Sequence, residues 1–278
     1  ASDSHTHPHD DDEVEDLEDS ERRTFKPFSI SAGAVWHSSG DSHISLSLAR
    51  DERAPTSQEL FSHGPHIASQ TFEIGDSSLD IESNLHAEIA YRVHGGQLTG
   101  SLVLYADNFS DYIYQQITGE EEDGLPVYQW SQQDADFFGG EIELRYDLGR
   151  LDSGHWQFTA FYDYVKAELS DGENVPLMPP SRFGLGLDWD LRQWAATVNW
   201  IHAMDHTRVA DHETRTQGYD LLNSEVSWLI PTGGHSDWQL FLQGQNLLDE
   251  DIRNSTSHLK DQAPQAGRNF ILGVRAKF

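Results

Sequence analysis

The chain contains no cysteine. Disulfide bonds and thiolate metal sites are therefore excluded, and metal ligands must come from imidazole and carboxylate groups. Basic residues are also scarce, since 18 Lys and Arg stand against 47 Asp and Glu among 278 residues, for a net charge of −29. This balance argues against a nucleic-acid partner, because phosphates need basic side chains, and it favours cations as ligands.

Long apolar segments are missing as well: no run approaches the roughly 20 residues of a membrane-spanning helix. A membrane β-barrel stays compatible, because its strands alternate apolar and polar side chains and its long polar loops dilute the average. The chain starts at Ala1 inside a polar segment, which we interpret as a mature or truncated piece of a larger protein. Gly-rich phosphate loops and His-Glu-x-x-His patterns are also missing, so we expect no enzyme.

The last ten residues show strict alternation of apolar and polar side chains. The apolar set is Phe270, Leu272, Val274, Ala276 and Phe278, and the other set includes Asn269, Gly273, Arg275 and Lys277. A strand with one apolar and one charged face suits a barrel wall, with lipid outside and a wet lumen inside.

The same alternation recurs along the chain and predicts eleven strands. They cover residues 28–36, 43–52, 85–93, 98–114, 138–148, 155–166, 183–191, 194–204, 219–230, 237–247 and 268–278. A soluble sandwich would alternate too, but six tryptophans lie at or near predicted strand ends on the apolar side. They are Trp36, Trp156, Trp189, Trp194, Trp228 and Trp238. Aromatic residues at both rims of an apolar band are typical of a membrane interface, which favours the barrel.

The predicted connections alternate strictly between short and long. The long ones are 1–23, 53–80, 115–136, 167–181, 205–218 and 248–267. Outer-membrane barrels have short periplasmic turns and long extracellular loops, so the final strand should descend and leave Phe278 at the periplasmic rim. We therefore expect an acidic, His-rich extracellular loop at 1–23 and antiparallel transmembrane β-barrel strands over 24–278. Eleven strands leave two open edges, so the remaining strands should come from an N-terminal part or a separate chain.

Several segments together resemble TonB-dependent receptors of the bacterial outer membrane. They are residues 49–61, 72–76, 79–83, 176–182, 244–249 and 267–278. The resemblance implies the C-terminal half of a 22-stranded barrel that normally surrounds a plug domain, with the plug absent from this chain. It also implies outer-membrane lipid, the missing N-terminal barrel half and, through the plug, the TonB complex as partners. Residues 61–66 with a His- and Asp-rich loop resemble the zinc-uptake receptors of the ZnuD type.

Residues 5–12 form the first candidate metal-binding segment. His5, His7 and His9 alternate, so in an extended segment their imidazoles project to one side, and Asp10, Asp11 and Asp12 add negative charge. Imidazole and carboxylate are good ligands for zinc and similar ions. Without apolar anchors the segment fits a flexible capture arm. The alternative interpretation is a solubilising acidic loop.

His63 and His66 form the second candidate. Gly64 and Pro65 lie between them, so we expect a turn that brings the two imidazoles together. A third ligand could be Glu59, Glu73 or Asp76, or a group from the missing half; two ordinary loop histidines are the alternative.

A third set lies at the outer end of one predicted strand and in its loop. It comprises His202, Asp205, His206, Asp211, His212 and Glu213. His202 and His206 would be about 13 Å apart along a strand. For this set we favour ordinary solvated side chains.

Together these patterns predict uptake of Zn²⁺ or a similar divalent metal, captured by His- and Asp-rich outer loops. Calcium is a further candidate ligand, because the outer loops are strongly acidic. Three alternatives stay open: a receptor for a ferric siderophore or haem, a non-transporting surface metal-binding protein or adhesin, and a secreted soluble metal-binding β protein.

Overall fold

The computed structural model describes residues 23–231 and 237–277. The wall strands are β1 (Ile30–Ser39), β2 (Ser42–Arg53), β5 (Glu82–Val93), β6 (Leu98–Glu122), β7 (Leu125–Leu151), β8 (Gly154–Leu169), β9 (Arg182–Leu191), β10 (Trp194–Ala203), β11 (Tyr219–Pro231), β12 (Asp237–Gln245) and β13 (Asn269–Lys277). Three short elements lie between β2 and β5, namely α1 (Ser57–Phe61), β3 (His63–His66) and β4 (Thr71–Ile74). No helix among the described residues is long and apolar enough to cross a membrane.

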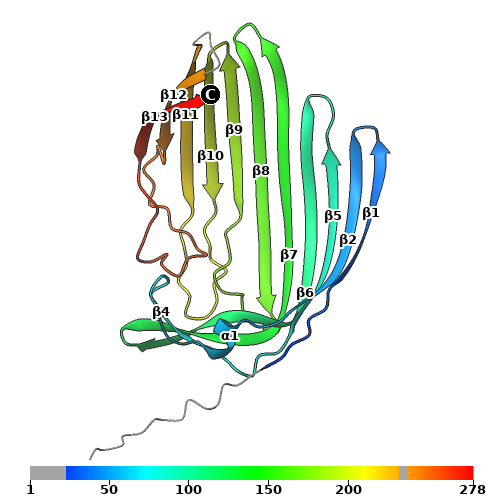
Figure 1. Ribbon diagram of the computed structural model, residues 1–278, viewed down its shortest axis with the longest axis vertical. Helices are drawn as coiled ribbons and strands as arrows, with labels where there is room; N and C mark the ends of the chain where they lie inside the picture. Colours follow the sequence, from blue (N-terminus) through cyan, green and yellow to red (C-terminus); the bar gives the residue numbers. More distant parts are fainter. Residues whose placement is uncertain (1–22, 232–236, 278) are drawn as a thin grey trace, which may run out of the picture.

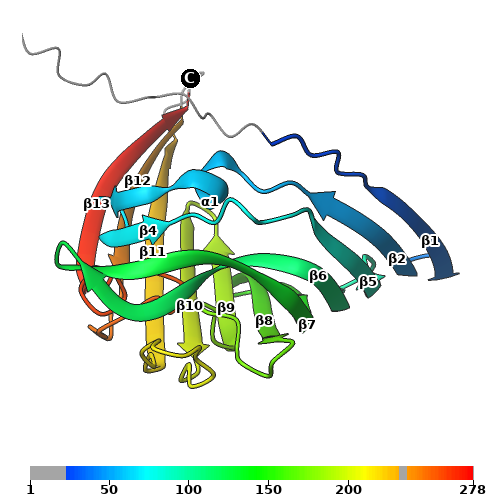
Figure 2. The same cartoon turned by 90° about the horizontal axis from the view of Figure 1, so that it is seen from below.

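The eleven wall strands form one antiparallel meander in chain order, from β1 at one edge to β13 at the other (Figure 1). Each of the eleven strands predicted from alternation is present, nine of them within a few residues of the expected bounds, while β6 and β7 extend well beyond theirs. The sheet curves strongly, and β1 and β13 lie at its two far edges (Figure 2). The fold is therefore all-β and forms part of a barrel wall, as predicted.

The outer face of the curved sheet is apolar and exposed. On β13 the side chains of Phe270, Leu272 and Val274 are all more than half exposed, with Leu272 at 71%. Arg275 points to the other face, where its guanidinium lies 4.0 Å from the Phe241 ring centroid and pairs with Glu225 at 2.9 Å. A greasy exterior opposite a charged interior is what a barrel wall requires. Phe278, expected at the periplasmic rim, lies outside the described residues.

The six tryptophans noted in the sequence lie at one rim of the sheet, not at both as expected. All six lie at the strand ends that the short connections join. Trp194 stacks on Trp228 with ring centroids 5.8 Å apart, and Trp156 lies 6.1 Å from Trp189. This belt marks one membrane interface, because indole prefers the headgroup level. We call this end the short-turn rim and the opposite end the long-loop rim.

The β6–β7 connection differs from the expected long loop over 115–136. The two strands continue as a paired ladder to a tight turn at Asp123 and Gly124, whose φ angles are 54° and 76°. Two consecutive positive φ angles are the requirement of a type I′ hairpin turn, which Asp-Gly satisfies. A bulge at Asp111, where φ is 59°, bends the distal part of this hairpin across the end of the sheet (Figures 1 and 2).

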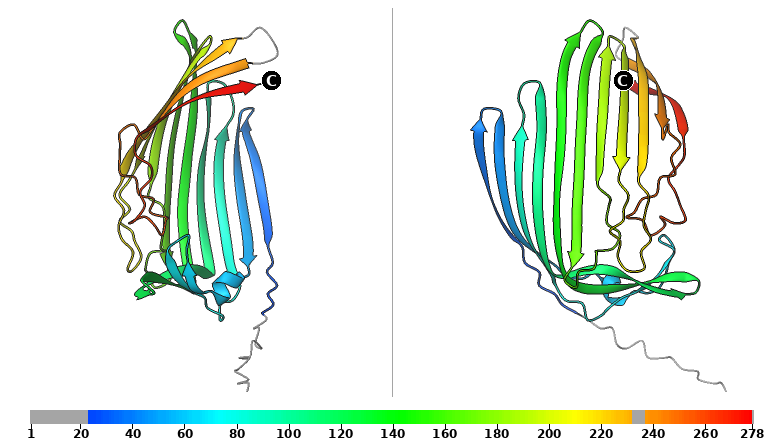
Figure 3. Two further views of the ribbon diagram at one scale, coloured as in Figure 1. Left: turned by 60° about the vertical axis from the view of Figure 1, so that its left-hand side comes forward. Right: turned by 180° about the vertical axis from the view of Figure 1, so that it is seen from behind.

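The connections at the long-loop rim pack together into one structure, which we call the outer cap. It contains α1, β3, β4, the distal β6–β7 hairpin and residues 170–181, 204–218 and 246–268 (Figure 3). Two apolar clusters are buried there or just beneath it. One contains Leu60, Leu79 and Ile113, and the other contains Ala135, Ala167, Leu169 and Val175. The buried core therefore supports the cap, whereas the wall exposes its apolar residues outward.

Arg53, at the end of β2, ties the cap to the wall. Its guanidinium donates two hydrogen bonds of 2.9 Å to Glu59 of α1 and reaches Glu82 of β5 at 3.0 Å. Glu59 also accepts a hydrogen bond from the Thr56 amide at 2.6 Å, which completes a capping box that starts α1. Glu82 in turn accepts the amide of Ile113 at 2.8 Å, so a single network joins β2, α1, β5 and β6.

Candidate metal-binding cluster in the outer cap

His63 and His66 lie on an extended strand, so the turn expected at Gly64 and Pro65 is wrong. β3 pairs with β4, and His63 faces Ile74 while His66 faces Thr71 in the register. Residues three apart on a strand point to opposite faces and lie about 10 Å apart, so the two imidazoles diverge. The His63 ring lies edge-on to Phe72, with centroids 5.5 Å apart.

His66 instead approaches Glu73, one of the three carboxylates that the sequence offered as a further ligand. The His66 Nδ1 atom lies 3.7 Å from Glu73 Oε1 and 2.7 Å from the Ser69 hydroxyl. Two donors on one tetrahedral zinc ion lie about 3.3 Å apart. A small movement of the half-exposed His66 side chain therefore suffices for the pair to share an ion.

Glu73 is held in place although it is only 4% exposed. Its Oε2 atom accepts a hydrogen bond of 2.7 Å from the side-chain amide of Gln58 on α1. The carboxylate belongs to β4, which pairs in parallel with β7 and places Glu73 beside Tyr128. A buried carboxylate with a single neutral donor retains lone pairs for a cation, and burial makes an uncompensated charge costly.

A third imidazole, His258, comes from the β12–β13 loop. Its ring lies edge-on to Tyr128 with centroids 4.8 Å apart. Its Nδ1 atom is buried and has no hydrogen-bond partner among the described residues. Burial lowers the pKa of His258; the negative charge of Glu73 opposes this shift and His66 adds to it. Neutral imidazole is the form that binds metal, so this environment favours ligation.

His66, Glu73, Tyr128 and His258 thus form one group, the cap cluster, built from β3, β4, β7 and the β12–β13 loop. Across residues 23–231 and 237–277, no three His, Asp or Glu side chains already converge on one metal position. Ion binding in the cap cluster therefore requires its imidazoles to move. The first candidate set, His5, His7, His9, Asp10, Asp11 and Asp12, lies outside the described residues.

The third set does not form one site. His202 remains on β10, where its Nδ1 lies 3.0 Å from Asp220, whereas His206 follows the strand and pairs through its backbone with Thr216. His206 is buried, and this burial lowers its pKa. The His212 ring packs against Gly119 near the hairpin tip, where an added Cβ would lie 2.8 Å from Nδ1. Glu213 instead pairs with Lys260 at 2.7 Å.

An acidic hollow of 380 Å³ lies at the cap ends of β10 and β11, where His202 and Asp220 share the sheet face of Trp194 and Val226. Its polar lining comes from His202, Asp205, Asp220 and Glu250. Asp220 accepts hydrogen bonds from Trp200 and interacts with His202, both near 3.0 Å. Such a hollow attracts cations, because low-dielectric walls concentrate the field of the carboxylates.

Sequence reasoning did not assign His258 and Tyr128 to a site. His258 lies about 190 residues from His66 and shares no motif with it, so only the packing of the cap brings them together. One signal was available for Tyr128, because Asp123-Gly124 predicts a hairpin that extends β6 and β7. That extension creates the strand beside which β4 and Glu73 lie.

Comparison with protein families identifies the class of the chain. Residues 2–247 match the family described as "TonB dependent receptor-like, beta-barrel". This match covers most of the sequence, so the chain belongs to that family. It is accordingly a bacterial outer-membrane protein.

Solved structures share the fold. The chain is similar to the copper transporter OprC, with 19% identity over 88% of this chain and 37% of that chain and a TM-score of 0.74. The chain is also similar to the FrpB iron transporter of Neisseria meningitidis, with 14% identity over 88% of this chain and 38% of that chain and a TM-score of 0.63. A ferric enterobactin receptor of Pseudomonas aeruginosa shows 14% identity over 90% of this chain and 40% of that chain, with a TM-score of 0.65. The chain therefore spans about two fifths of each of these proteins.

Proposed function

We propose that this chain is the C-terminal barrel part of a TonB-dependent transporter that takes up a divalent transition metal, with zinc as the expected ion. The observation that carries this proposal is the cap cluster, in which His66 approaches the buried carboxylate of Glu73, and His258 packs against Tyr128, the residue opposite Glu73 in the register. Nitrogen and oxygen donors of this kind suit Zn²⁺, and Cu²⁺ accepts the same donors. We propose no catalytic role for the chain.

The long-loop rim should face the cell exterior, because outer-membrane barrels carry long loops outside and short turns in the periplasm. The segment with His5, His7 and His9, predicted from the sequence as an extracellular loop, would then collect ions outside the cell. The acidic hollow at His202 and Asp220, at the cap ends of β10 and β11, offers a further attractive position for a cation. Energy for release would come from TonB acting through the plug of the complete receptor.

The test uses the complete receptor in cells with no other high-affinity zinc uptake. The double variant His66→Ala and His258→Ala should slow uptake of radioactive zinc at limiting concentration and impair growth without added metal. The matched control is His63→Ala with His212→Ala, which removes two exposed imidazoles from the same cap but outside the cluster. The control should transport zinc at the wild-type rate.

Three other outcomes would reject parts of the proposal. Wild-type zinc uptake by the double variant would remove the cap cluster as a capture site. Zinc binding without any dependence on TonB would favour a surface metal-binding protein or adhesin. Receptor-dependent growth on a ferric siderophore or haem, without receptor-dependent zinc uptake, would favour an iron-uptake receptor. Competition of Cu²⁺ and Ca²⁺ with zinc uptake would establish the preferred ion.

A further inference from the structure

Three histidines gather at the short-turn rim, at the opposite end of the wall from the cap cluster. His37 near the end of β1 lies directly opposite His43 at the start of β2. His94 follows β5 by one residue and is tied to the preceding turn, since its amide donates a hydrogen bond of 2.8 Å to the Asp41 carbonyl. We call these three residues the rim triad.

The rings of the rim triad form a continuous row. The centroids of His37 and His43 are 5.9 Å apart, and those of His43 and His94 are 5.2 Å apart with the planes 29° from parallel. Two imidazoles on one tetrahedral zinc ion have centroids about 5 Å apart. The spacing of the row therefore matches shared ligation, although the stacked rings must rotate to direct their nitrogens at one point.

The rim triad differs from the other histidines on the wall strands. His86, His155 and His202 each have a ring nitrogen within 3.1 Å of an aspartate oxygen. In the described part of the chain, the triad rings have no such carboxylate partner and no hydrogen bond to another side chain. Their nitrogens are available to an ion, and the exposed rings of His37 and His94 can turn without disturbing a core.

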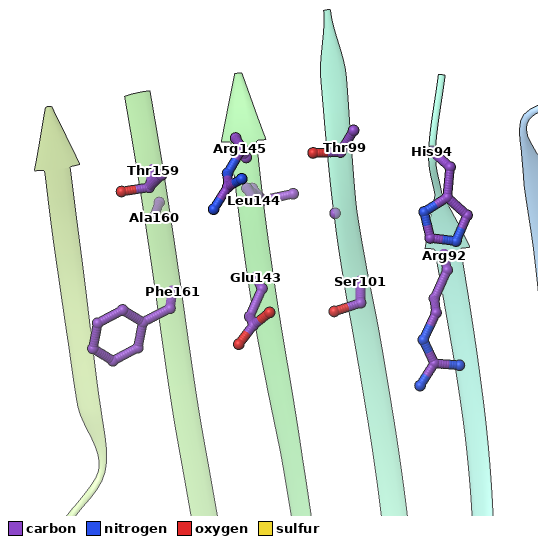
Figure 4. Close-up of a pocket in the computed structure, with 11 residues that line it drawn as sticks. Arg92, His94, Thr99, Ser101, Glu143, Leu144, Arg145, Thr159, Ala160 and Phe161 are labelled. Atoms are coloured by element: carbon purple, nitrogen blue, oxygen red, sulfur yellow. The ribbon is translucent and has the colours of Figure 1, made fainter. Parts of the chain in front are cut away.

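The surroundings allow an ion to reach the triad and to leave it. A hollow of 530 Å³ opens on the inner face beside His94, between Arg92, Glu143 and Arg145 (Figure 4). The Asp41 side chain lies against Gly95 in the turn that carries His94 and adds a nearby negative charge. Arg92, opposite His43 in the register, donates to Ser45 at 3.1 Å and opposes tight cation binding. These opposed charges favour an exchangeable site over a permanent one.

We propose that the rim triad is a second, exchangeable binding site for a divalent transition metal at the periplasmic mouth of the barrel. His37 and His43 form a cross-strand ligand pair, and His94 supplies the third imidazole. An ion that leaves the lumen would meet this site last. The binding itself does not depend on the cap cluster, so either site can fail without the other.

The test measures Zn²⁺ binding to the purified complete receptor in which His5, His7, His9, His66 and His258 are already replaced by Ala. Titration calorimetry should still detect a zinc site in this background, and X-ray absorption should report imidazole ligands. Adding His37→Ala and His43→Ala should abolish that binding. The matched control adds His86→Ala and His155→Ala, which removes two carboxylate-paired imidazoles of the wall and should leave the binding in place.

Unchanged zinc binding after the triad substitutions, or equal loss in the control, would overturn the proposal. A second measurement does not depend on the folding of variants. The unmodified receptor is treated with Cu²⁺ and ascorbate, which oxidises side chains that hold the copper ion, and the oxidised residues are mapped by mass spectrometry. Oxidation at His37, His43 and His94 above that at His86 is expected, and equal oxidation at all four would count against the site.

Discussion

Lys260 and Glu213 form an enclosed ion pair inside the outer cap. Their charged atoms lie 2.7 Å apart, and the side chains are only 6% and 1% exposed. Lys260 also donates to the Thr214 carbonyl at 2.7 Å, while Glu213 accepts the Ala210 amide at 3.0 Å. The pair therefore joins the β10–β11 loop to the β12–β13 loop, which carries His258.

Replacing Lys260 by Met should destabilise the cap by about 3–5 kcal/mol, because it leaves the Glu213 carboxylate buried without a partner. Hydrogen exchange of residues 204–218 and 250–262 measures the effect. The double variant Lys260→Met with Glu213→Gln should recover much of the protection, since no unpaired charge remains. Equal loss in the single and double variants would contradict this account.

At the residue scale, ligation of a cation by imidazole and carboxylate stays a prediction, and the expected meeting of His63 and His66 is wrong. His66 was predicted as a ligand and lies beside Glu73, yet its expected partner His63 points away because β3 is extended. His258 contacts Tyr128 only through the fold of the cap. Long-range packing of loops leaves no local periodicity, so such contacts are not readable from spacing.

Among the elements, the bent β6–β7 hairpin depends on Gln132. Its side chain accepts the Asp80 amide at 2.9 Å and donates to the carbonyls of Asp80 and Asp111, also at 2.9 Å. One side chain thus links the bulge of β6 to the segment that precedes β5. The bulge itself is a feature that period-two alternation predicts poorly.

Gln132→Leu should weaken this connection by about 1–2 kcal/mol, since three hydrogen bonds are lost at a partly exposed position. Faster hydrogen exchange at residues 78–82 and 110–113 is the expected result. Gln129→Leu, three residues away on the same strand, is the matched control, because Gln129 forms no side-chain hydrogen bond with another described residue. A similar change in both variants would indicate a general effect of added apolar surface.

Two histidines, the buried His206 and the partly buried His258, make the outer cap sensitive to acid. Burial lowers the pKa of both His206 and His258 in the folded cap, whereas an unfolded segment would have the ordinary value near 6.5. The unfolded cap therefore binds protons more tightly, so the cap keeps its full stability above about pH 6.5 and loses it as the pH falls below that value.

Limited proteolysis of the cap loops between about pH 7.5 and 5.5 should show increasing cleavage toward the acidic end. The variant His206→Gln with His258→Gln should make cleavage nearly independent of pH in this window. A pH dependence that persists unchanged in the double variant would assign it to other groups.

For the elements, alternation predicted the wall well and the cap poorly. Each wall strand has one lipid-facing and one lumen-facing side, so apolar and polar residues alternate along its sequence with a period of two. The distal hairpin instead packs on cap loops over part of each face, and its alternation there is weak. The Asp123-Gly124 turn was the readable signal, yet residues 115–136 were predicted as one long loop.

For the molecule as a whole, neighbouring residues of one strand should respond oppositely to charge. Leu242 on β12 is half exposed on the apolar face, whereas Gln243 faces the interior and lies opposite Glu225 in the register. Leu242→Arg should cost about 2–4 kcal/mol in a bilayer, and Gln243→Arg should cost little. Folding of the complete receptor into lipid vesicles over a urea series tests this, and equal costs would contradict the assigned faces.

The predicted barrel class and antiparallel strand order are confirmed, whereas the long loop predicted between β6 and β7 is a tight hairpin turn. Physical constraints explain this success, because a lipid-embedded wall must pair every backbone group and present apolar side chains outward. The identity of the transported ion does not follow from those constraints. The choice of ion depends on a few donor side chains in the cap, and the barrel wall common to the family does not specify these side chains.

The tryptophan belt at a single rim has a mechanical consequence. Six indoles anchor that end at a fixed depth, whereas Trp200 on β10, packed on Phe183, is the one tryptophan of the described wall near the opposite end, outside the distal β6–β7 hairpin. A change in bilayer thickness is then absorbed mainly at the far side, where the loops would rise out of the headgroups or sink toward them. Lipid composition would in this way adjust how far the cation-collecting surface stands above the cell.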